Sequence, residues 1–496
     1  MSPPVTSTQG VLSTSLLLCL CLLTAPLSAI AVALATLRTT LKEREAEENR
    51  SLIGDQRGRR TALVNGGRMQ KSLFVARALS KRGFRVVLVE ERGWGEACSA
   101  RFSNAVSTFR TVPSGGGRSY VTALVQVALE EDICLFVPCS GAGTTVEDAQ
   151  AGERMRRELG VLAIIQDTEL VQTLHEKDLF IALARRLGFD TPASTLVRSP
   201  EEAIELLRQP GQLPMLLKAA NVLDDVGRSD MTTYPLCDAS GKVDWDLTEK
   251  KLRTGLFIPL TEKSPYVAQE FIGGEGASEW CTHATVIEGK IRAFVCCPSN
   301  DMLMTYVDMT ESPIGRRALR WTQDFIEKLD SFKPTGHFSF DFIHQPETDR
   351  LVVLECNPRV HTAICLLSDL ADELGSILGA IDANADMIIP AQNVATISWI
   401  GHDAVARLAP SFLTAKLRHL IHPLWICSSS LSSPPLSQLI HQPGRVDAAW
   451  DWSDPFPFFA LYHIQWPHLL LRQLLIRQRA WSRINLSTAR IFEASS

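Results

Sequence analysis

The segment FSFDFIHQPETDRLVVLECNPRVHTA contains the residues with the clearest chemical potential in this chain. Its pattern predicts two adjacent strands joined by a polar turn, with Asp341 in the first strand and Glu355 and Asn357 near the end of the second. Residues two apart on a strand face the same side, so Glu355 and Asn357 share a face and Asp341 can lie opposite them. Two carboxylates and an amide oxygen form a hard oxygen site suited to Mg²⁺, which binds a few carboxylates together with nucleotide phosphates.

An ordinary surface hairpin with solvated charges is the alternative for this segment. Asp341 stands in the apolar run FSFDFI and Glu355 in LVVLECNP, where an unpaired charge would be costly. This placement favours a functional site. Arg359 and His361 follow with the same alternation and could face a phosphate or an anionic transition state.

Two lysines and an acidic strand lie upstream of this segment. Lys218 ends the apolar run MLLKAA, where its ammonium is desolvated unless it meets an anion, and Lys177 opens a helix. The predicted strand YVAQEFI runs into a loop that is followed by Glu279, which could hold ribose hydroxyls, while backbone groups in 269–272 could hold an adenine edge. Taken singly, each lysine is more often a solvated surface charge than a ligand.

The elements that must position these residues follow an α/β pattern. TALVNGG is a short apolar strand ending in two glycines, MQKSLFVARALSKRG has helical periodicity, and RVVLVE and CLFVPCSGAG are further strands. Strand, glycine-rich turn, helix and strand make a βαβ unit with a parallel sheet. The full G-x-G-x-x-G pattern is absent, so Gly66 and Gly67 alone are a weak signal for a dinucleotide site.

From about Asp167 the pattern changes to a helical segment, DTELVQTLHEKDLFIALARRLGFDTP, followed by strands of a mixed or antiparallel sheet. These strands are PMLLKAA, YVAQEFI, CTHATVIEGK, IRAFVCC, GHFSFDFI and RLVVLECNP. The fold class is therefore α/β with a second α+β part. We predict a membrane anchor and charged linker over 1–58, an α/β domain over 59–166, a second domain over 167–390 and a C-terminal extension over 391–496.

The first 37 residues contain no charged side chain, and the apolar run 11–37 can span a bilayer core of roughly 30 Å. Arg38, Lys42 and Arg44 follow the run, which favours an anchor with the body on the cytosolic side over a cleaved signal peptide. A secreted protein is the alternative, and glycosylation at Asn49 or Asn485 would distinguish it, since both lie in Asn-x-Ser/Thr sequons.

The C-terminal sequence contains a basic amphipathic stretch. Apolar residues at 469–471 and 474–476 are interleaved with Arg472, Arg477, Arg479 and Arg483. A helix of this kind either lies in a membrane interface or docks on the protein's own core, and the sequence favours neither.

Charge and cysteine spacing argue against a nucleic-acid partner and against a zinc site. The formal net charge of −5 and the pI near 6.2 argue against a nucleic-acid binder, which usually has a basic excess. The 12 cysteines stand singly in apolar runs or as the neighbours Cys296 and Cys297, with no Cys-x-x-Cys spacing for zinc. Reduced, buried thiols in a cytosolic protein are the better interpretation.

In their order along the chain, these pieces resemble the ATP-grasp superfamily. The family pattern is a helix-borne lysine, a strand-borne lysine about forty residues on, a hinge strand of the Gln-Glu-Phe-Ile type, and a carboxylate pair ending in Glu-x-Asn-x-Arg. The resemblance implies ATP and Mg²⁺ (or Mn²⁺) as cofactors, and an α/β domain before the grasp. By this resemblance, Lys177 and Lys218 would bind the ATP phosphates, and Arg359 would stabilise the transferring phosphate. The adenine pocket would be lined by Gln269, Glu270 and Ile272, and Glu279 would bind ribose. The metal would be held by Asp341, Glu355 and Asn357.

A closer resemblance covers most of the chain. The apolar N-terminus, VNGGRMQKSLFVARAL, CTHATV, FVCC, FSFDFI, ECNPRVHTA and WDWSDPFPFF together resemble the mycosporine-glycine synthetases, which join an amino acid to the cyclohexenone 4-deoxygadusol using ATP. This implies a carbon–nitrogen ligase of secondary metabolism, acting on an amino acid and a small acceptor. Fungal gene clusters also contain such relatives that act on other acids and amines. The alternative is a catalytically inactive, membrane-anchored ATP-binding scaffold, which the loss of a lysine or carboxylate would have favoured.

Overall fold

The computed structural model describes residues 7–50, 60–93, 97–211, 214–220, 232–238, 240–256, 258–273, 276–299, 305–329, 333–380, 386–401, 444–472, 474–475, 481–485 and 490–493. The first domain contains a parallel sheet with strand order β3-β2-β1-β4-β5. Its strands are β1 (Thr61–Val64), β2 (Arg85–Glu91), β3 (Thr108–Val112), β4 (Ile133–Val137) and β5 (Leu162–Ala163). The predicted βαβ unit is confirmed.

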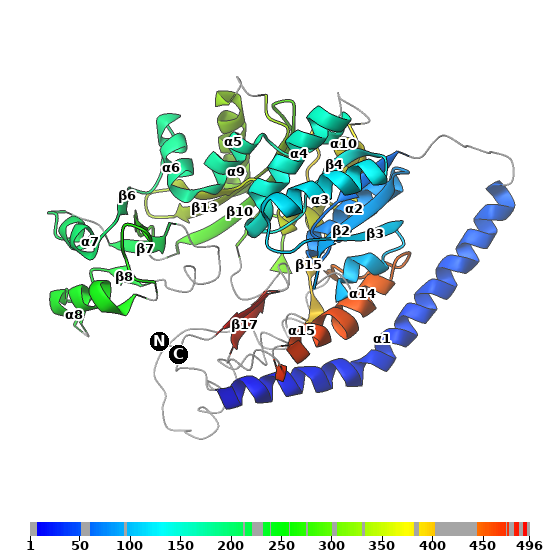
Figure 1. The fold of residues 1–496 in the computed structure, drawn as a ribbon, viewed down its shortest axis with the longest axis horizontal. Coiled ribbons are helices and arrows are strands. Elements are labelled where there is room, and N and C mark those ends of the chain that lie inside the picture. Colours follow the sequence, from blue (N-terminus) through cyan, green and yellow to red (C-terminus); the bar gives the residue numbers. More distant parts are fainter. Residues whose placement is uncertain are drawn as a thin grey trace.

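Helices cover both faces of this sheet because its central strands are apolar throughout (Figure 1). Ala62 and Val64 pack into one apolar cluster with residues of α2 (Gln70–Lys81) and α10 (Ala371–Leu378), whereas Leu63 packs into another with α3 (Gly117–Glu130) and α4 (Thr145–Leu159). Successive strand residues alternate between the faces, so one short strand supplies both clusters. The turn after β1 requires glycine, because Gly66 has φ +69° and a Cβ there would lie 2.7 Å from the Cys139 backbone.

Two antiparallel sheets follow, as the sequence predicts. One has the order β6-β9-β7-β8 and the other β11-β10-β13-β14. The strands of the first are β6 (Ser194–Val197), β7 (Met215–Ala219), β8 (Thr233–Tyr234) and β9 (Tyr266–Glu270), and those of the second are β10 (Ser278–Ile287), β11 (Lys290–Pro298), β13 (Gly336–Gln345) and β14 (Arg350–Asn357). Helices α7 (Pro200–Leu207) and α8 (Trp245–Lys250) accompany the first sheet.

The helical segment predicted after Asp167 contains two helices, and the second begins at Lys177 as predicted. Helix α5 (Thr168–His175) ends at Glu176, whose extended backbone (φ −79°, ψ 121°) separates it from α6 (Lys177–Arg186). Helix α6 and α9 (Pro313–Lys328) pack on the β13 sheet through aromatic rings: the Phe180 centroid lies 6.0 Å from that of Phe340 and 6.1 Å from that of Phe325. This packing fixes where α6 begins.

The predicted C-terminal extension packs on the rest of the chain. Strands β15 (Thr396–Ser398) and β16 (Arg445–Asp447) form a small sheet with β12 (Thr305–Tyr306), and α14 (Phe456–Ala460), the π-helical turn η7 (Leu461–Gln465) and α15 (Trp466–Arg472) follow. Residues 402–443 of this extension lie outside the described residues.

The amphipathic tail helix is shorter than its sequence pattern. Helix α15 ends at Arg472, and Leu469 and Leu470 are buried against the body, which favours docking on the protein's own core for this part. Farther along, β17 (Trp481–Asn485) pairs with β18 (Arg490–Glu493) instead of continuing a helix. Residues 476–480 lie outside the described part of the chain.

The N-terminal helix α1 (Ser7–Arg50) runs along one edge of the molecule beside α14 and α15 (Figure 1). Its part Thr8–Leu41 contains a stretch with a mean hydropathy of 2.5 and is long and apolar enough to cross a membrane, a test that a signal sequence also passes. The charged segment predicted as a linker continues the same helix to Arg50, and 51–58 of that linker lie outside the described residues.

Candidate functional site

Three predicted metal ligands come together on one face of the β13–β14 pair. Asp341 is the cross-strand partner of Glu355, as expected, and Asn357 is the partner of Ser339, which also faces the Asp341 side. The Asn357 Nδ2 atom donates to Asp341 Oδ2 at 3.2 Å and to Glu355 Oε1 at 3.4 Å. The two carboxylates therefore converge on one amide.

The same face extends onto β10. Cys281 pairs with Asp341, and Glu279 pairs with Ile343, so Glu279 lies on the carboxylate side of the sheet. Glu279 is exposed, whereas Asp341 and Glu355 are half-buried. The row of acidic side chains thus runs from the solvent-exposed edge of the sheet towards its interior.

Lys177 joins this group because α6 begins at that residue. Its Nζ atom lies 3.5 Å from Glu355 Oε2, and the two side chains are 29% and 15% exposed. The break at Glu176 and the anchoring of Phe180 on the sheet present the first residue of α6 to the end of β14. A lysine in this position can offset negative charge on the carboxylates or on a bound phosphate.

Lys218 and Gln269 form a second group on the other antiparallel sheet. Lys218 lies on β7 and pairs with Val267 of β9, and its Nζ atom donates to the Gln269 side-chain oxygen at 2.6 Å. Gln269 is 4% exposed, so its amide needs this partner. The desolvated ammonium predicted for Lys218 is half-buried and bonded to a neutral oxygen.

Glu270 and Ile272 continue the strand of Gln269. The Glu270 carboxylate accepts from Ala193 N at 2.9 Å, and its own N–H donates to Ala193 O at 2.7 Å, which ties β9 to the start of β6. Ile272 is 4% exposed. These contacts place Glu270 in a strand-joining role alongside any role towards a nucleotide.

Arg359 and His361 lie directly after β14. The Arg359 N–H donates to Asn357 O at 2.8 Å, and its carbonyl accepts from Ser339 Oγ at 3.1 Å, so its backbone is fixed beside the carboxylate face. The His361 Nδ1 accepts from Ala363 N at 3.1 Å. Both residues are half-buried.

A buried pair of histidines lies farther inward on the carboxylate face of the sheet. The sequence did not identify these two residues as a pair. The rings of His283 on β10 and His337 on β13 stack at 5.3 Å, and Thr285 Oγ1 lies 3.2 Å from a nitrogen of each. Burial lowers the pKa of His283 well below its usual value, and burial and Lys71 lower the pKa of His337 to about 3. Both imidazoles are therefore neutral near pH 7.

Lys71, on α2 of the first domain, meets the site from the other side. It is 6% exposed, and its Nζ atom donates to Val360 O at 2.6 Å. Burial first, and then the nearby charge of Arg359, lower the Lys71 pKa to about 7. Lys71 of the first domain and Arg359 of the second domain are thus neighbours where the two domains meet.

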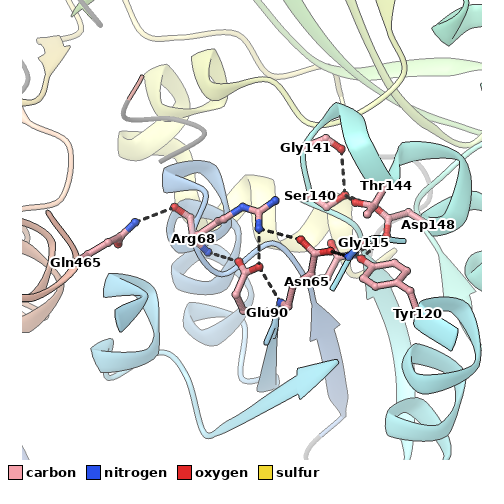
Figure 2. Close-up of polar contacts among 11 residues, drawn as sticks. Asn65, Arg68, Glu90, Gly115, Tyr120, Ser140, Gly141, Thr144, Asp148 and Gln465 are labelled. Carbon is pink, nitrogen blue, oxygen red and sulfur yellow. Dashed lines mark hydrogen bonds and ion pairs between the residues drawn. The ribbon is translucent and has the colours of Figure 1, made fainter. Parts of the chain in front are cut away.

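A polar network lies at the carboxyl edge of the parallel sheet (Figure 2). The Asn65 Nδ2 donates to Asp148 Oδ1 at 2.6 Å, Tyr120 OH donates to the same oxygen at 2.9 Å, and Ser140 Oγ donates to Asp148 Oδ2. Burial raises the pKa of Asp148 to about 7, although these three donors lower it. The network holds the turn after β1 against α3 and α4.

Arg68 and two carboxylates complete this edge (Figure 2). Glu90 accepts from Arg68 N at 2.6 Å, and the Arg68 guanidinium lies 3.3 Å from Glu90 Oε1 and 2.8 Å from Glu91 Oε2. A small hollow here is lined by Asn65, Arg68, Glu90, Tyr120, Ser140 and Thr144. One feature of the sequence could have indicated this hollow: the second strand of the βαβ unit, RVVLVE, ends in the acidic residue Glu90.

Comparison with known proteins shows sequence similarity to the large chain of carbamoyl phosphate synthase. The chain is 26% identical to the protein of Deinococcus deserti over 305 residues, which are 59% of this chain and 27% of that one. It is 23% identical over 222 residues to the C-terminal section of the Methanopyrus kandleri protein, covering 42% of this chain and 37% of that one. The chain thus spans about a quarter to a third of the length of these curated relatives. No protein-family model matches it.

Solved structures with some likeness include an N5-carboxyaminoimidazole ribonucleotide synthetase in complex with ADP, with a TM-score of 0.49 and 12% identity over 67% of this chain and 79% of that one. Biotin carboxylase from Campylobacter jejuni gives a TM-score of 0.47 and 14% identity over 64% of this chain and 70% of that one. The sequence similarity to carbamoyl phosphate synthase large chains supports an enzyme of the ATP-grasp superfamily.

Proposed function

We propose that the chain is an ATP-dependent ligase that forms a C–N bond between an amino acid and a phosphate-activated acceptor, either a carboxylate or a cyclohexenone. The observation that supports this most directly is the convergence of Asp341, Glu355 and Asn357 on one sheet face, with Lys177 beside them. The similarity to carbamoyl phosphate synthase, whose name describes a phosphorylated product, supports an acceptor that receives phosphate.

A Mg²⁺ ion fits the donor chemistry of this cluster. Asp341 and Glu355 are carboxylates drawn together by one amide, and Asn357 can turn its oxygen towards a cation. The described residues contain no group of three or more His, Cys, Asp and Glu for a metal, but Mg²⁺ needs only one or two carboxylates plus phosphate oxygens. When bound, the ion offsets negative charge on the phosphates of ATP.

The remaining residues position and stabilise charge. Lys177 and Lys218 would bind ATP phosphates from the helix and strand sides, and Arg359 would stabilise the transferring phosphate. Gln269, Glu270 and Ile272 would line the adenine pocket, and Glu279 would bind ribose. Residues 221–231, which follow the strand of Lys218, lie outside the described residues.

The reaction proceeds in two displacements. An oxygen of the acceptor attacks the γ-phosphorus of ATP, and the bond to the ADP oxygen breaks. The nitrogen of the amino acid then attacks the activated carbon and loses a proton, and inorganic phosphate leaves with the electron pair of the C–O bond. Because hydroxide is a poor leaving group and phosphate a good one, the first step makes the second feasible. Positioning and charge stabilisation supply the catalysis.

The test is ADP release by the full-length protein with a panel of amino acids and carbonyl acceptors, with products identified by mass. Wild type should sustain ADP release over many turnovers only when both an amine and an acceptor are present, because the acceptor alone permits only the first displacement. Lys218→Met should reduce that rate about a hundredfold, whereas Lys250→Met, at an exposed lysine of α8, should leave it unchanged. ATP binding without ADP release for any pair would support an inactive scaffold instead.

A further inference from the structure

The two sides of α1 differ in composition. The residues buried against the body are mostly small or carry hydroxyl groups: Gly10, Ser13, Thr14, Leu17, Val32 and Ala35. The outward side is aliphatic, and Leu22, Leu23, Leu27 and Leu34 on it are 74%, 76%, 69% and 60% exposed. A surface helix of a water-soluble protein has the opposite arrangement, with its apolar face inward.

Polar contacts attach the inner side of α1 to the C-terminal segment. The Thr14 hydroxyl accepts from Trp481 Nε1 at 2.9 Å near one end, and Thr39 Oγ1 donates to Trp452 O at 2.9 Å near the other. Between them, His463 Nδ1 lies 2.9 Å from the Cys21 carbonyl oxygen. The helix is therefore joined to its neighbour along most of its apolar length.

The C-terminal segment is in turn fixed to the α/β domain. Arg77 of α2 forms an ion pair with Asp454 at 2.8 Å, and Ser99 N donates to Gln465 Oε1 at 2.8 Å. Figure 1 shows α14 and α15 between α1 and the parallel sheet. Helix α1 is consequently held sideways against a folded body.

This attachment is incompatible with a simple bilayer crossing. From Thr14 to Thr39 an α-helix rises about 37 Å, more than the roughly 30 Å of a bilayer core. A helix crossing the core over that length would carry the C-terminal segment and its loops into hydrocarbon, where lipid-exposed irregular backbone is not tolerated. The contacts require the helix axis to lie along the surface of the body.

We propose that α1 lies in the interfacial layer of a phospholipid bilayer, parallel to the membrane plane, with its leucine side in lipid and its hydroxyl side on the body. This replaces a spanning anchor with an in-plane one and is independent of the ligase reaction. The end of the contact region suits a headgroup layer, because the Arg38 guanidinium stacks 5.1 Å from the ring of Trp452, which is 54% exposed. Indole rings favour this layer, and guanidinium groups attract anionic lipid.

The experiment uses the full-length chain with an N-terminal epitope, incorporated from detergent into preformed vesicles of phosphatidylcholine and phosphatidylglycerol. The wild type should float with the vesicles, and protease added outside should remove the epitope, because both ends of an in-plane helix stay on the outer side. The variant Leu22→Asn/Leu23→Asn/Leu27→Asn should lose vesicle binding about tenfold or more. The matched variant Leu129→Asn/Leu162→Asn/Leu247→Asn changes exposed leucines elsewhere and should bind as the wild type does.

Four results would overturn the proposal. An epitope protected until the vesicles are lysed would show a spanning helix, and a purified chain lacking its first residues would show a cleaved signal. Unchanged binding of the α1 triple variant would remove lipid as the occupant of this side. A wild-type dimer that does not bind vesicles, and that the triple variant converts to a monomer, would assign the leucine side to a second copy of the chain.

Discussion

Replacing Glu355 with glutamine separates the chemical role of the carboxylate from its structural role. Glutamine has nearly the same size and can still accept from Asn357 and Lys177, but it removes the charge that a cation would bind. Glu355 lies 3.5 Å from Lys177 Nζ, and the pair is 15% and 29% exposed. The change is thus small in shape and large in charge.

The expected effect of Glu355→Gln on stability is much smaller than its expected effect on the reaction rate. At an effective dielectric constant near 20, charges 3.5 Å apart attract by about 5 kcal/mol before desolvation and entropy are subtracted. Partly exposed pairs retain only about 1 kcal/mol or less of this, so unfolding should shift by no more than about 3 °C. Loss of a charge contact in the transition state costs on the order of 3 kcal/mol, or about a hundredfold in rate.

The assay is amine- and acceptor-dependent ADP release at saturating ATP, beside a thermal unfolding curve for each protein. Glu347→Gln is the control, because it makes the same chemical change at an exposed carboxylate in the turn between the same two strands. Asp341→Asn should reproduce the loss of rate. A folded Glu355→Gln protein that turns over within about threefold of wild type would refute the assignment of this carboxylate to the metal.

The remaining predictions concern charge, pH and the C-terminal segment. Lys177→Met should lower turnover about tenfold or more and raise the ATP concentration needed for half-maximal rate, since phosphate charge loses a partner, and equal kinetics would exclude Lys177 from the site. The folded-state pKa of His337 is about 3, below the ordinary histidine value of 6.5, so the unfolded chain binds more protons between these values and stability should fall as pH drops through that window. At pH 5 the loss due to His337 is about 2 kcal/mol. His337→Gln should remove this part and leave the part due to buried His283, whereas His468→Gln, at an exposed histidine, should leave the pH dependence unchanged; denaturant midpoints across pH decide this. Asp454→Ala leaves Arg77, Ser103 and Asn104 without their shared acceptor and should lower the free energy of unfolding by about 3 kcal/mol in urea titrations, whereas a change below about 0.5 kcal/mol would contradict a structural role.

Local patterns in the sequence predicted the strands around the site well. Asp341 lies on the face opposite the buried phenylalanines of the alternating run FSFDFI, which the sequence shows directly. The short turn brings Glu355 opposite Asp341, but the irregularity in the pairing after Asp341 was not predicted. The start of α6 at Lys177 was also predicted. The extended backbone at Glu176 was not, because glutamate does not by itself force an extended conformation. Such a break is set by packing of Phe180 on the sheet.

Contacts between distant segments could not be predicted. Lys71 reaches Val360 across 289 residues, and nothing around Lys71 in the sequence marks it as a partner of the carboxylate domain. The stacking of His283 on His337 depends on β10 pairing with β13, which the order of strands along the chain does not specify. The polar network of Asn65, Tyr120 and Asp148 combines a turn and two helices in the same way.

The sideways attachment of α1 has a consequence for synthesis. Thr14 and its partner Trp481 are 467 residues apart, so the ribosome makes the helix first and its docking surface last. At roughly 5 to 20 residues per second, the leucine-rich helix waits roughly 20 to 90 s before that surface exists. During this interval the nascent helix offers its apolar side to chaperones or to a nearby membrane. Contacts made during this interval therefore act on the location of the helix before the rest of the chain has folded.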